Sequence, residues 1–385
     1  MSLRYAVAAC QTAFDCPTDR GEIAARVQRM CAMAEQTIVG YEPFFDVRLL
    51  AFPEFAHAAP VHDSVAKLRD RLAVEIPNEH TAAYEAVCRR WGCWIQTGTF
   101  LEAHPDHPDV VFNTTCLVGP NGIELVYRKV NPWIPWELHA SPHDVPGLLD
   151  DPFPVADTEI GRIGCAICYD WLFPETIREL AFRGAEILVR VSAYMDPWGA
   201  TPPMDWWTLF NRTRAAENTA IVLAANQGAA MSSYPPFSWP GSSMVVDHDG
   251  RVLSAADPGP GEKVVVAEID VDAVRAARAR RRGHDTLGHH RAGLYGAGAR
   301  AGGQVGPDPA PAPDPAPDPD ADAGMVPGTD TGTDADARAG AAAARERLDP
   351  AASHPIARSE ILQRIARGRA RQDDEAGGRP GGTPA

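Results

Sequence analysis

The stretch RIGCAICYDWLFPE, residues 162–175, joins an apolar strand to the start of a helix and leaves one cysteine at the junction. Residues 163–167 have the length and apolar character of a buried strand, and Pro174 and Glu175 favour the first turn of a helix. The thiol of Cys168 is therefore expected to project from a sheet edge near a helix N-terminus, whose partial positive charge favours the thiolate. A cysteine after a buried strand is more often a small core residue, so this position alone does not establish a nucleophile.

Strands and helices alternate on both sides of this stretch. Apolar runs of strand length occupy residues 5–9, 47–52, 93–99, 113–118, 162–167, 187–191, 221–225, 243–246 and 264–269. Apolar residues recur at helical spacing in residues 21–38, 80–90, 175–183 and 205–218. The turns at 119–122 and 247–250 are typical of hairpin connections. This order predicts a layered α/β fold with a mixed sheet.

The composition excludes several classes of partner. The chain has 385 residues, of which 45% are apolar, and this is enough for one large core. A formal charge of −15 and a pI near 5.2 offer no basic face to phosphate backbones, so we expect no nucleic-acid partner. We find neither a secretory signal pattern nor an apolar run of the roughly 18 residues that span a bilayer. We therefore expect a soluble, cytoplasmic protein without a membrane partner, whose eight cysteines are reduced.

The composition changes sharply after about Tyr295. Residues 302–340 are dominated by Pro, Ala, Asp and Gly and contain too few large apolar residues to offset the entropy of ordering, which predicts disorder. Residues 353–372 place isoleucine and leucine among arginines. This last segment is consistent with a solvated tail or with a short basic amphipathic helix that docks on a subunit or a membrane.

Two further residues follow apolar runs in the same way as Cys168. Glu54 comes just after the run at 47–52, at the end of a strand where open α/β sheets place their ligands, and a carboxylate there suits general-base chemistry. Lys129 ends a strand-like run among aromatic residues and prolines. Taken singly, the glutamate is also explained by a helix cap or an ion pair, and the lysine by a solvated charge.

Together, these three residues and their contexts resemble the nitrilase superfamily of carbon-nitrogen hydrolases, whose catalytic triad is Glu, Lys and Cys in this order. The matching segments are Phe52-Pro53-Glu54, Tyr127-Arg128-Lys129 and Gly164-Cys165-Ala166-Ile167-Cys168-Tyr169-Asp170. The resemblance covers roughly residues 3 to 295. It implies a four-layer αββα sandwich with mixed β-sheets in residues 1–296, a separate tail in residues 297–385, and assembly into homo-oligomers.

Within that superfamily, residues 129–137 look like the aliphatic amidase and formamidase branch. In that branch a second glutamate, here Glu137, follows the lysine by eight positions and helps to position the lysine and the substrate. The branch has tyrosine directly after the first glutamate, whereas this chain has Phe55, so the substrate preference of that branch does not carry over. We expect Phe55, Trp133 and Tyr169 to contact the substrate.

The residues after the nucleophile favour a neutral substrate. In the carbamoylases and ω-amidase-like members, an arginine at the position of Leu172, and often of Trp171, binds the substrate carboxylate through a bidentate pair. Both positions are apolar here, which indicates a small neutral amide rather than an acidic one. Arg190, Arg212 or Arg214 remain candidates to replace that arginine from elsewhere in the fold.

The resemblance implies hydrolysis of a non-peptide C–N bond, as in an amidase. Glu54 accepts the thiol proton, Cys168 attacks the amide to form a thioester, and Lys129 stabilises the oxyanion, with no metal and no organic cofactor. A nitrile or an N-carbamoyl amide is the nearest alternative substrate. A redox or binding protein that uses the Cys165/Cys168 pair is the alternative from another class. Positions three apart on a strand face opposite sides, however, which disfavours a dithiol.

Overall fold

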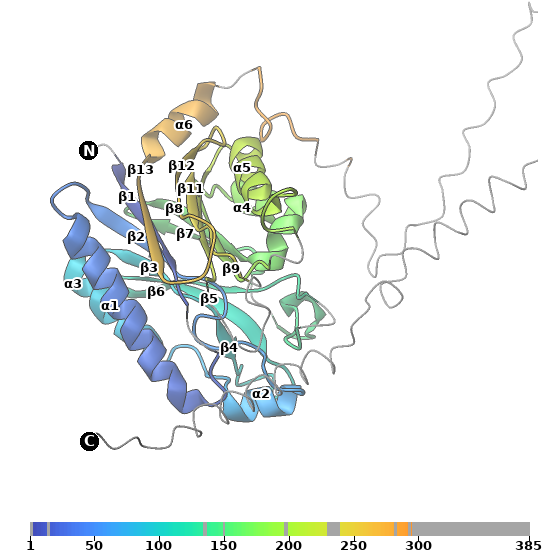
Figure 1. The fold of residues 1–385 in the computed structure, drawn as a ribbon. Helices are drawn as coiled ribbons and strands as arrows, with labels where there is room; N and C mark the ends of the chain where they lie inside the picture. The colour runs from blue at the N-terminus through green and yellow to red at the C-terminus, as the bar shows by residue number, and fades with distance from the viewer. Residues whose placement is uncertain are drawn as a thin grey trace, which may run out of the picture. The chain divides into compact units, whose positions relative to one another are not determined.

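The computed structural model describes residues 3–13, 16–133, 137–148, 151–195, 199–228, 239–280, 283–291 and 294. Two mixed β-sheets lie face to face, and helices cover their outer faces (Figure 1). Helices α1 (Ile23–Tyr41) and α3 (Glu79–Trp91) lie on one sheet, and α4 (Pro174–Phe182) and α5 (Trp206–Asn218) lie on the other. The predicted four-layer αββα arrangement is confirmed.

The first sheet carries its parallel strands in the middle. Its order is β13-β1-β2-β3-β5-β4, and β6 pairs with β5. Strands β1, β2 and β3 run parallel to one another, and the remaining pairs are antiparallel. The strands are β1 (Arg4–Gln11), β2 (Val47–Ala51), β3 (Trp94–Gln96), β4 (Phe100–Glu102), β5 (Phe112–Gly119), β6 (Gly122–Arg128) and β13 (Lys263–Asp270).

The second sheet repeats this plan. Its order is β12-β11-β10-β9-β8-β7, with a parallel centre made of β8, β9 and β10. The strands are β7 (Val155–Thr158), β8 (Gly161–Ile167), β9 (Ile187–Ser192), β10 (Ile221–Asn226), β11 (Met244–Val246) and β12 (Val252–Ala255). The carboxyl ends of the parallel strands are where chemistry is expected in sheets of this kind.

Side-chain alternation along the strands explains why both faces of each sheet are buried. In β1, Tyr5, Val7 and Ala9 pack in the cluster between the sheets, whereas Ala6, Ala8 and Cys10 pack in the cluster under α1 and α3. Because successive side chains of a strand point to opposite faces, a continuous apolar run fits a strand covered on both sides.

Local sequence signals set the helix ends. The side chain of Asn78 accepts hydrogen bonds from the backbone N–H groups of His80 and Thr81 and so caps α3, which ends at Gly92 with a φ of 63°. Pro174 occupies the first turn of α4, where its missing N–H is not needed. The other helices are α2 (Val65–Arg71), α6 (Val271–Arg280) and the 3₁₀ turns η1 (Arg20–Glu22), η2 (Pro142–Asp144) and η3 (Cys168–Leu172).

The strands and helices predicted from the sequence are present, with bounds that differ by a few residues, and both predicted hairpins join antiparallel strands. Helix α4 begins at Pro174, where the sequence predicted a helix start, and the five-residue turn η3 joins it to Cys168. Strands β4 and β7 and helices α2 and α6 were not predicted from the sequence, because they are short or lack clean periodicity. The predicted tail at 297–385, with its helical segment at 353–372, lies outside the described residues.

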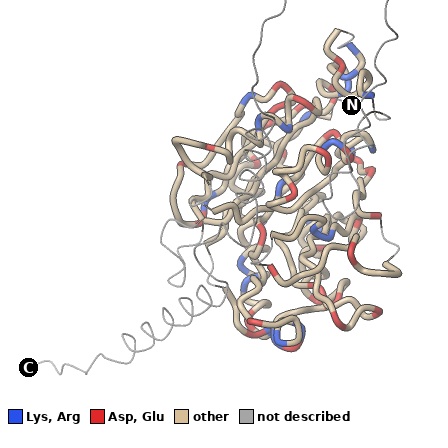
Figure 2. The backbone as a smooth tube through the Cα atoms, turned by 90° about the vertical axis from the view of Figure 1, so that its right-hand side faces the viewer, with Lys and Arg blue, Asp and Glu red and all other residues tan. Residues whose placement is uncertain are grey.

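Charged residues of both signs are interspersed along the described backbone (Figure 2). In the part of the chain that the structure describes, none of the helices is long and apolar enough to cross a bilayer.

Candidate active site

Three of the predicted site residues follow strand ends and meet between the two sheets. Glu54 lies three positions after β2, Lys129 directly after β6, and Cys168 directly after β8. The Nζ atom of Lys129 donates a hydrogen bond of 2.8 Å to Oε1 of Glu54. Both residues also act electrostatically on the Cys168 thiol. The structure thus brings together residues that lie up to 114 positions apart, since 168 − 54 = 114.

Glu54 is held by donors from both sheets. Its Oε1 also accepts a hydrogen bond of 2.9 Å from the Asn113 side chain, and its Oε2 accepts one of 3.0 Å from the backbone N–H of Ala193. Its backbone carbonyl accepts a hydrogen bond from Gln227. With an exposed fraction of 1%, this carboxylate is buried and satisfied, as a buried charge must be.

The turn after Glu54 is strained and braced. Phe55 has a φ of 61°, a left-handed conformation that non-glycine residues rarely adopt, and its N–H donates to Thr99 Oγ1. His57 stacks on Phe100 and lies between the Thr99 carbonyl and the Tyr84 hydroxyl. Burial lowers the pKa of His57 to about 3, so this imidazole is a neutral structural brace.

Lys129 is shared between two carboxylates. Its Nζ donates to both oxygens of Glu137, at 2.7 and 2.9 Å, in addition to Glu54. Glu137 also accepts the backbone N–H of Trp133 at 2.6 Å, and His139 Nε2 lies 3.1 Å from its Oε2. Burial disfavours the ammonium, but Glu137 and Glu54 outweigh it and raise the pKa of Lys129. The lysine is therefore a fixed cation.

Cys168 begins the turn η3 in a left-handed conformation, with a φ of 44°. Burial raises the pKa of its thiol to about 12, and Glu54 adds to this shift. Lys129, the Ser192 hydroxyl and Arg190 act in the opposite direction. Helix α4 begins six residues after Cys168, and desolvation outweighs the groups that favour the thiolate.

Asp170 ties the turn of Cys168 to the chain that carries Lys129. One of its oxygens accepts the Tyr127 hydroxyl at 2.7 Å and the Ile167 N–H at 3.0 Å. The other accepts the backbone and side-chain N–H groups of Asn131. Burial raises the pKa of this fully buried carboxyl, while these hydrogen bonds favour its charged form. Strand β6 and the end of β8 are thereby fixed relative to each other.

The three residues predicted to contact substrate are partly buried. Phe55 packs against a small cluster that contains Ala193 and Trp239, and Tyr169 lies edge-on to Phe173 with ring centroids 5.1 Å apart. Trp133 lies between Lys129 and Glu137 in the chain and donates its N–H to Glu137. Their contact with a substrate stays a prediction.

Cys165 faces a different environment from Cys168. It lies inside β8, fully buried, where Gln96 and Cys116 of the opposite sheet surround it. Both cysteines are free thiols. Among the described residues, no group of three or more His, Cys, Asp or Glu side chains is arranged to hold a metal ion.

Apart from Lys129, the partners of Glu54 and Glu137 were not predicted from the sequence. Asn113 lies in a buried run whose next two residues are threonines, and polar residues at such positions are a usable signal. His139 follows Glu137 by two positions and carries no local signal of its own. The N–H of Ala193 is a backbone group, which a sequence motif does not reveal.

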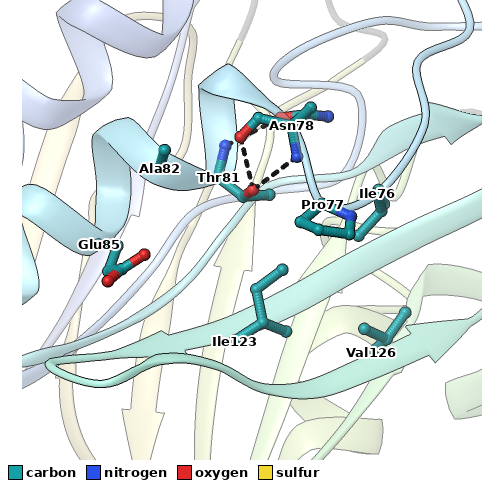
Figure 3. A pocket seen from close by; sticks show the side chains of 8 residues that line it. All are labelled: Ile76, Pro77, Asn78, Thr81, Ala82, Glu85, Ile123 and Val126. Atoms are coloured by element: carbon teal, nitrogen blue, oxygen red, sulfur yellow. Dashed lines mark hydrogen bonds between the residues drawn. The ribbon is translucent and has the colours of Figure 1, made fainter.

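A pocket on the outer side of the first sheet is separate from these residues (Figure 3). The Asn78 and Thr81 polar groups in it already form the cap of α3. Its lining contains no nucleophile, and we assign it no chemistry. The pocket is lined by Ile76, Pro77, Asn78, Thr81, Ala82, Glu85, Ile123 and Val126.

Related proteins are carbon-nitrogen hydrolases. A formamidase of Bradyrhizobium sp. (strain ORS 278) is 31% identical over 238 residues, which are 60% of this chain and 62% of that protein. A formamidase of Photorhabdus laumondii is 28% identical over 260 residues, with 66% of this chain and 70% of that protein covered. The chain thus spans less than two thirds of the length of the first of these relatives.

Solved structures share the fold. Nit3 of Saccharomyces cerevisiae, described as a member of branch 10 of the nitrilase superfamily, superposes with a TM-score of 0.59 at 24% identity, over 72% of this chain and 97% of that one. A mutant of the amidase from Nesterenkonia sp. AN1 superposes with a TM-score of 0.56 at 21% identity, over 75% of this chain and 95% of that one. The sequence pattern of the family described as Carbon-nitrogen hydrolase matches residues 6–279. This chain therefore belongs to the carbon-nitrogen hydrolases of the nitrilase superfamily.

Proposed function

We propose that this chain hydrolyses a small neutral amide to a carboxylic acid and ammonia, with Cys168 as nucleophile. The observation that carries this proposal is that buried Lys129 donates hydrogen bonds to both Glu54 and Glu137, beside the turn that holds Cys168. A cation and a carboxylate fixed around a thiol provide the proton acceptor and the oxyanion donor that acyl transfer needs.

The reaction starts with the neutral thiol. With a pKa of about 12, only about one thiol in 10⁵ is ionised at pH 7, so a base must remove the proton during attack. Glu54 accepts this proton as sulfur bonds to the carbonyl carbon. Lys129 and the backbone N–H that follows Cys168 stabilise the oxyanion.

The tetrahedral intermediate then collapses. The C–N bond breaks as Glu54 returns its proton to the nitrogen, and ammonia leaves a thioester on Cys168. Glu54 next takes a proton from water, the hydroxyl adds to the thioester carbonyl, and the C–S bond breaks to release the acid. The thiolate recovers the proton from Glu54, so the enzyme returns to its starting state.

Glu137 serves as a positioning residue for this chemistry. Through its two hydrogen bonds it fixes the Nζ atom that Glu54 also contacts. The lysine is thereby held without side-chain freedom before the substrate arrives, and preorganised donors cost no reorganisation during the reaction.

Two observations support a small neutral amide. The relatives named above are formamidases, and the solved Nesterenkonia amidase carries an acetamide moiety on its active-site cysteine. Trp171, at a position where acid-binding members have arginine, is fully buried and donates to the Ala166 carbonyl. We propose that Phe55, Trp133 and Tyr169 contact the substrate. Because the amidase branch has tyrosine at the position of Phe55, we expect the preference of this chain among short amides to differ from that of the branch.

We also propose that residues 1–296 form the hydrolase domain, with residues 297–385 as a separate tail, and that the protein works in the cytoplasm as a homo-oligomer. Exposed apolar side chains on α4 and α5, namely Phe182, Trp206 and Leu209, support self-association. Sedimentation velocity tests this assembly, and a monomer at micromolar concentration would contradict it.

Ammonia release from formamide, acetamide, propionamide, acetonitrile and N-carbamoyl-β-alanine tests the reaction. We expect release from short neutral amides that is lost in Cys168→Ala and kept in the matched variant Cys165→Ala. Activity in Cys168→Ala contradicts the mechanism, and turnover of only the nitrile or the carbamoyl compound contradicts the substrate class. A loss in Cys165→Ala with Cys168→Ala active would instead assign the nucleophile to Cys165.

A further inference from the structure

Arg190 is a fully buried arginine in the middle of β9. Its guanidinium lies between the second sheet and α5, and its Nη1 donates a hydrogen bond of 2.9 Å to the Asn211 side chain. The rings of Trp207, Tyr194 and Trp171 surround it, with centroids 4.3, 5.3 and 5.4 Å from the guanidinium carbon. Burial lowers the pKa of this guanidinium to about 10, so the arginine is still charged at neutral pH.

This cation is not matched by an anion. Within the described residues, its Nε and Nη2 atoms have no hydrogen-bond partner, and no carboxylate lies at ion-pair distance from it. Aromatic faces offset part of the desolvation of a cation, but a buried charge is normally paired. The unused donors therefore indicate an anionic group that this arginine meets during function.

The neighbouring arginines that the sequence analysis considered are already occupied. Arg212 is exposed and donates to the Gly250 carbonyl. Arg214 donates to the carbonyls of Trp171 and Leu172 and pairs with Glu217 at 2.9 Å. Of the three, only Arg190 has buried donors without a hydrogen-bond partner among the described residues.

The register of the second sheet places Arg190 close to the Cys168 turn. Ile167 pairs with Val191, and Ala166 pairs with Arg190. Arg190 of β9 therefore lies beside the last residues of β8, which Cys168 directly follows. Arg190 and Ser192 share one face of β9, and both act on the Cys168 thiol. Trp171, from the turn of Cys168 itself, covers the guanidinium.

The charges around Cys168 explain why a second cation is needed. Lys129 already serves Glu54 and Glu137, so this trio carries a net negative charge before the thiol ionises. Asp170 in the turn of Cys168 adds a carboxyl, whereas Tyr194 after β9 is neutral, since burial raises its pKa to about 12. Burial disfavours an anionic sulfur at this position. Once Glu54 has taken the thiol proton and is neutral, Arg190 is the cation near this sulfur that no carboxylate among the described residues pairs.

We propose that Arg190 is a positioning residue that stabilises the anionic sulfur of Cys168, both as it attacks the substrate and as it leaves the thioester. This inference rests on the proposed function of Cys168 as nucleophile. It assigns the unpaired guanidinium to the enzyme's own sulfur rather than to a carboxylate of the substrate.

The rate of Cys168 alkylation by iodoacetamide at neutral pH tests this proposal in the intact chain, with modification followed on the Cys168 peptide by mass spectrometry. Far below the pKa of the thiol, this rate follows the thiolate fraction, which changes about tenfold for each unit of pKa. In Arg190→Met, which keeps a straight apolar side chain among the rings, we expect the alkylation rate to fall about 10-fold or more. Arg190→Lys keeps the charge and should stay near the wild-type rate. Arg212→Gln removes an exposed arginine and should leave the rate unchanged.

Three outcomes overturn the proposal. The first is an alkylation rate in Arg190→Met equal to that of the wild type in a folded protein. The second is a rate in Arg190→Lys that falls as far as that of Arg190→Met, because charge is then not the cause. The third is an unchanged rate with loss of activity on acidic amides alone, which makes Arg190 a carboxylate-binding residue.

The alkylation assay is independent of turnover, so the two proposals fail separately. Ammonia release by Cys168→Ala contradicts the proposed function, whereas an unchanged alkylation rate in Arg190→Met contradicts the role of Arg190. Thermal unfolding distinguishes a structural role, because replacing an unpaired buried charge by an apolar side chain should leave the melting temperature of Arg190→Met at or above that of the wild type.

Discussion

Replacing Glu137 with glutamine removes one of the two negative charges that share Lys129 and keeps the size of the side chain. The carboxylate accepts Lys129 Nζ at 2.7 and 2.9 Å and the Trp133 N–H at 2.6 Å. A glutamine has a single oxygen to offer, so its amide N–H group must face another donor. Glu54 is then the one carboxylate of the two that still pairs with Lys129, so the lysine loses its fixed position.

The size of the effect follows from this burial. Removing one partner of a buried ion pair costs about 3–5 kcal/mol, and glutamine keeps one acceptor, so we expect about 3 kcal/mol. If this is lost from the transition state, kcat falls by about 100-fold. KM should change less, because Glu137 acts through Lys129.

Steady-state ammonia release with acetamide measures this effect, and Glu186→Gln is the matched control. Glu186 is also buried and paired, since it accepts Arg275 at 2.5 and 3.0 Å, but it precedes β9 at the end away from the site. We expect both variants to lose stability in urea and only Glu137→Gln to lose kcat. Equal activity losses in the two variants, or an unchanged kcat in Glu137→Gln, would refute the reasoning.

Three further predictions concern the frame around the site. Burial lowers the pKa of His57 from 6.5 to about 3, so its contribution to stability is fully present above pH 6.5 and is lost as the pH falls toward 3. Between pH 7.5 and 5 the unfolding free energy measured in urea should therefore fall by about 2 kcal/mol less in His57→Gln than in the wild type. The same pH dependence in both proteins would contradict this. A Cβ added at Gly98 would lie 2.6 Å from the Pro53 carbonyl oxygen, so Gly98→Ala should displace the Glu54 turn and lower kcat at least about 10-fold. Gly40 has open space around it, so Gly40→Ala should leave activity unchanged. Equal kinetics in both variants would argue against a tight turn at Glu54. Asp170→Asn places an amide N–H group against the donors of Tyr127, Ile167 and Asn131. We therefore expect the unfolding free energy to fall by about 2–3 kcal/mol and kcat to decrease. Wild-type values of both quantities would show that the link between β6 and β8 is dispensable.

The convergence of Glu54, Lys129 and Cys168 was implied by the family resemblance, and each residue also follows an apolar strand. These residues come within three positions of the ends of β2, β6 and β8, and strand ends in layered α/β folds converge. The layered α/β class followed from the apolar runs, since their continuous apolar character fits strands covered on both faces, whereas the four-layer αββα arrangement was implied by the resemblance.

The remaining features depend on contacts between distant segments. The raised pKa of Cys168 has no local sequence signal, because it comes from burial of the thiol in the folded chain. The sequence shows Arg190 as an arginine in an apolar strand. That two of its donors have no partner among the described residues could not be predicted, because it depends on how α5 and the turn of Cys168 pack against it. Asn113 and the Ala193 N–H reach Glu54 through sheet pairing and sheet packing, which periodicity alone does not reveal.

The most direct test of a thioester mechanism is to trap the acyl-enzyme. The protein is mixed with propionamide, quenched in acid within the first turnovers and digested, and the peptides are weighed. We predict a propionyl group on the peptide that contains Cys168, absent from Cys168→Ala and removed by hydroxylamine. An enzyme that releases ammonia from propionamide while its quenched peptides carry no acyl group, or carry one on another residue, would contradict the assignment of Cys168 as nucleophile.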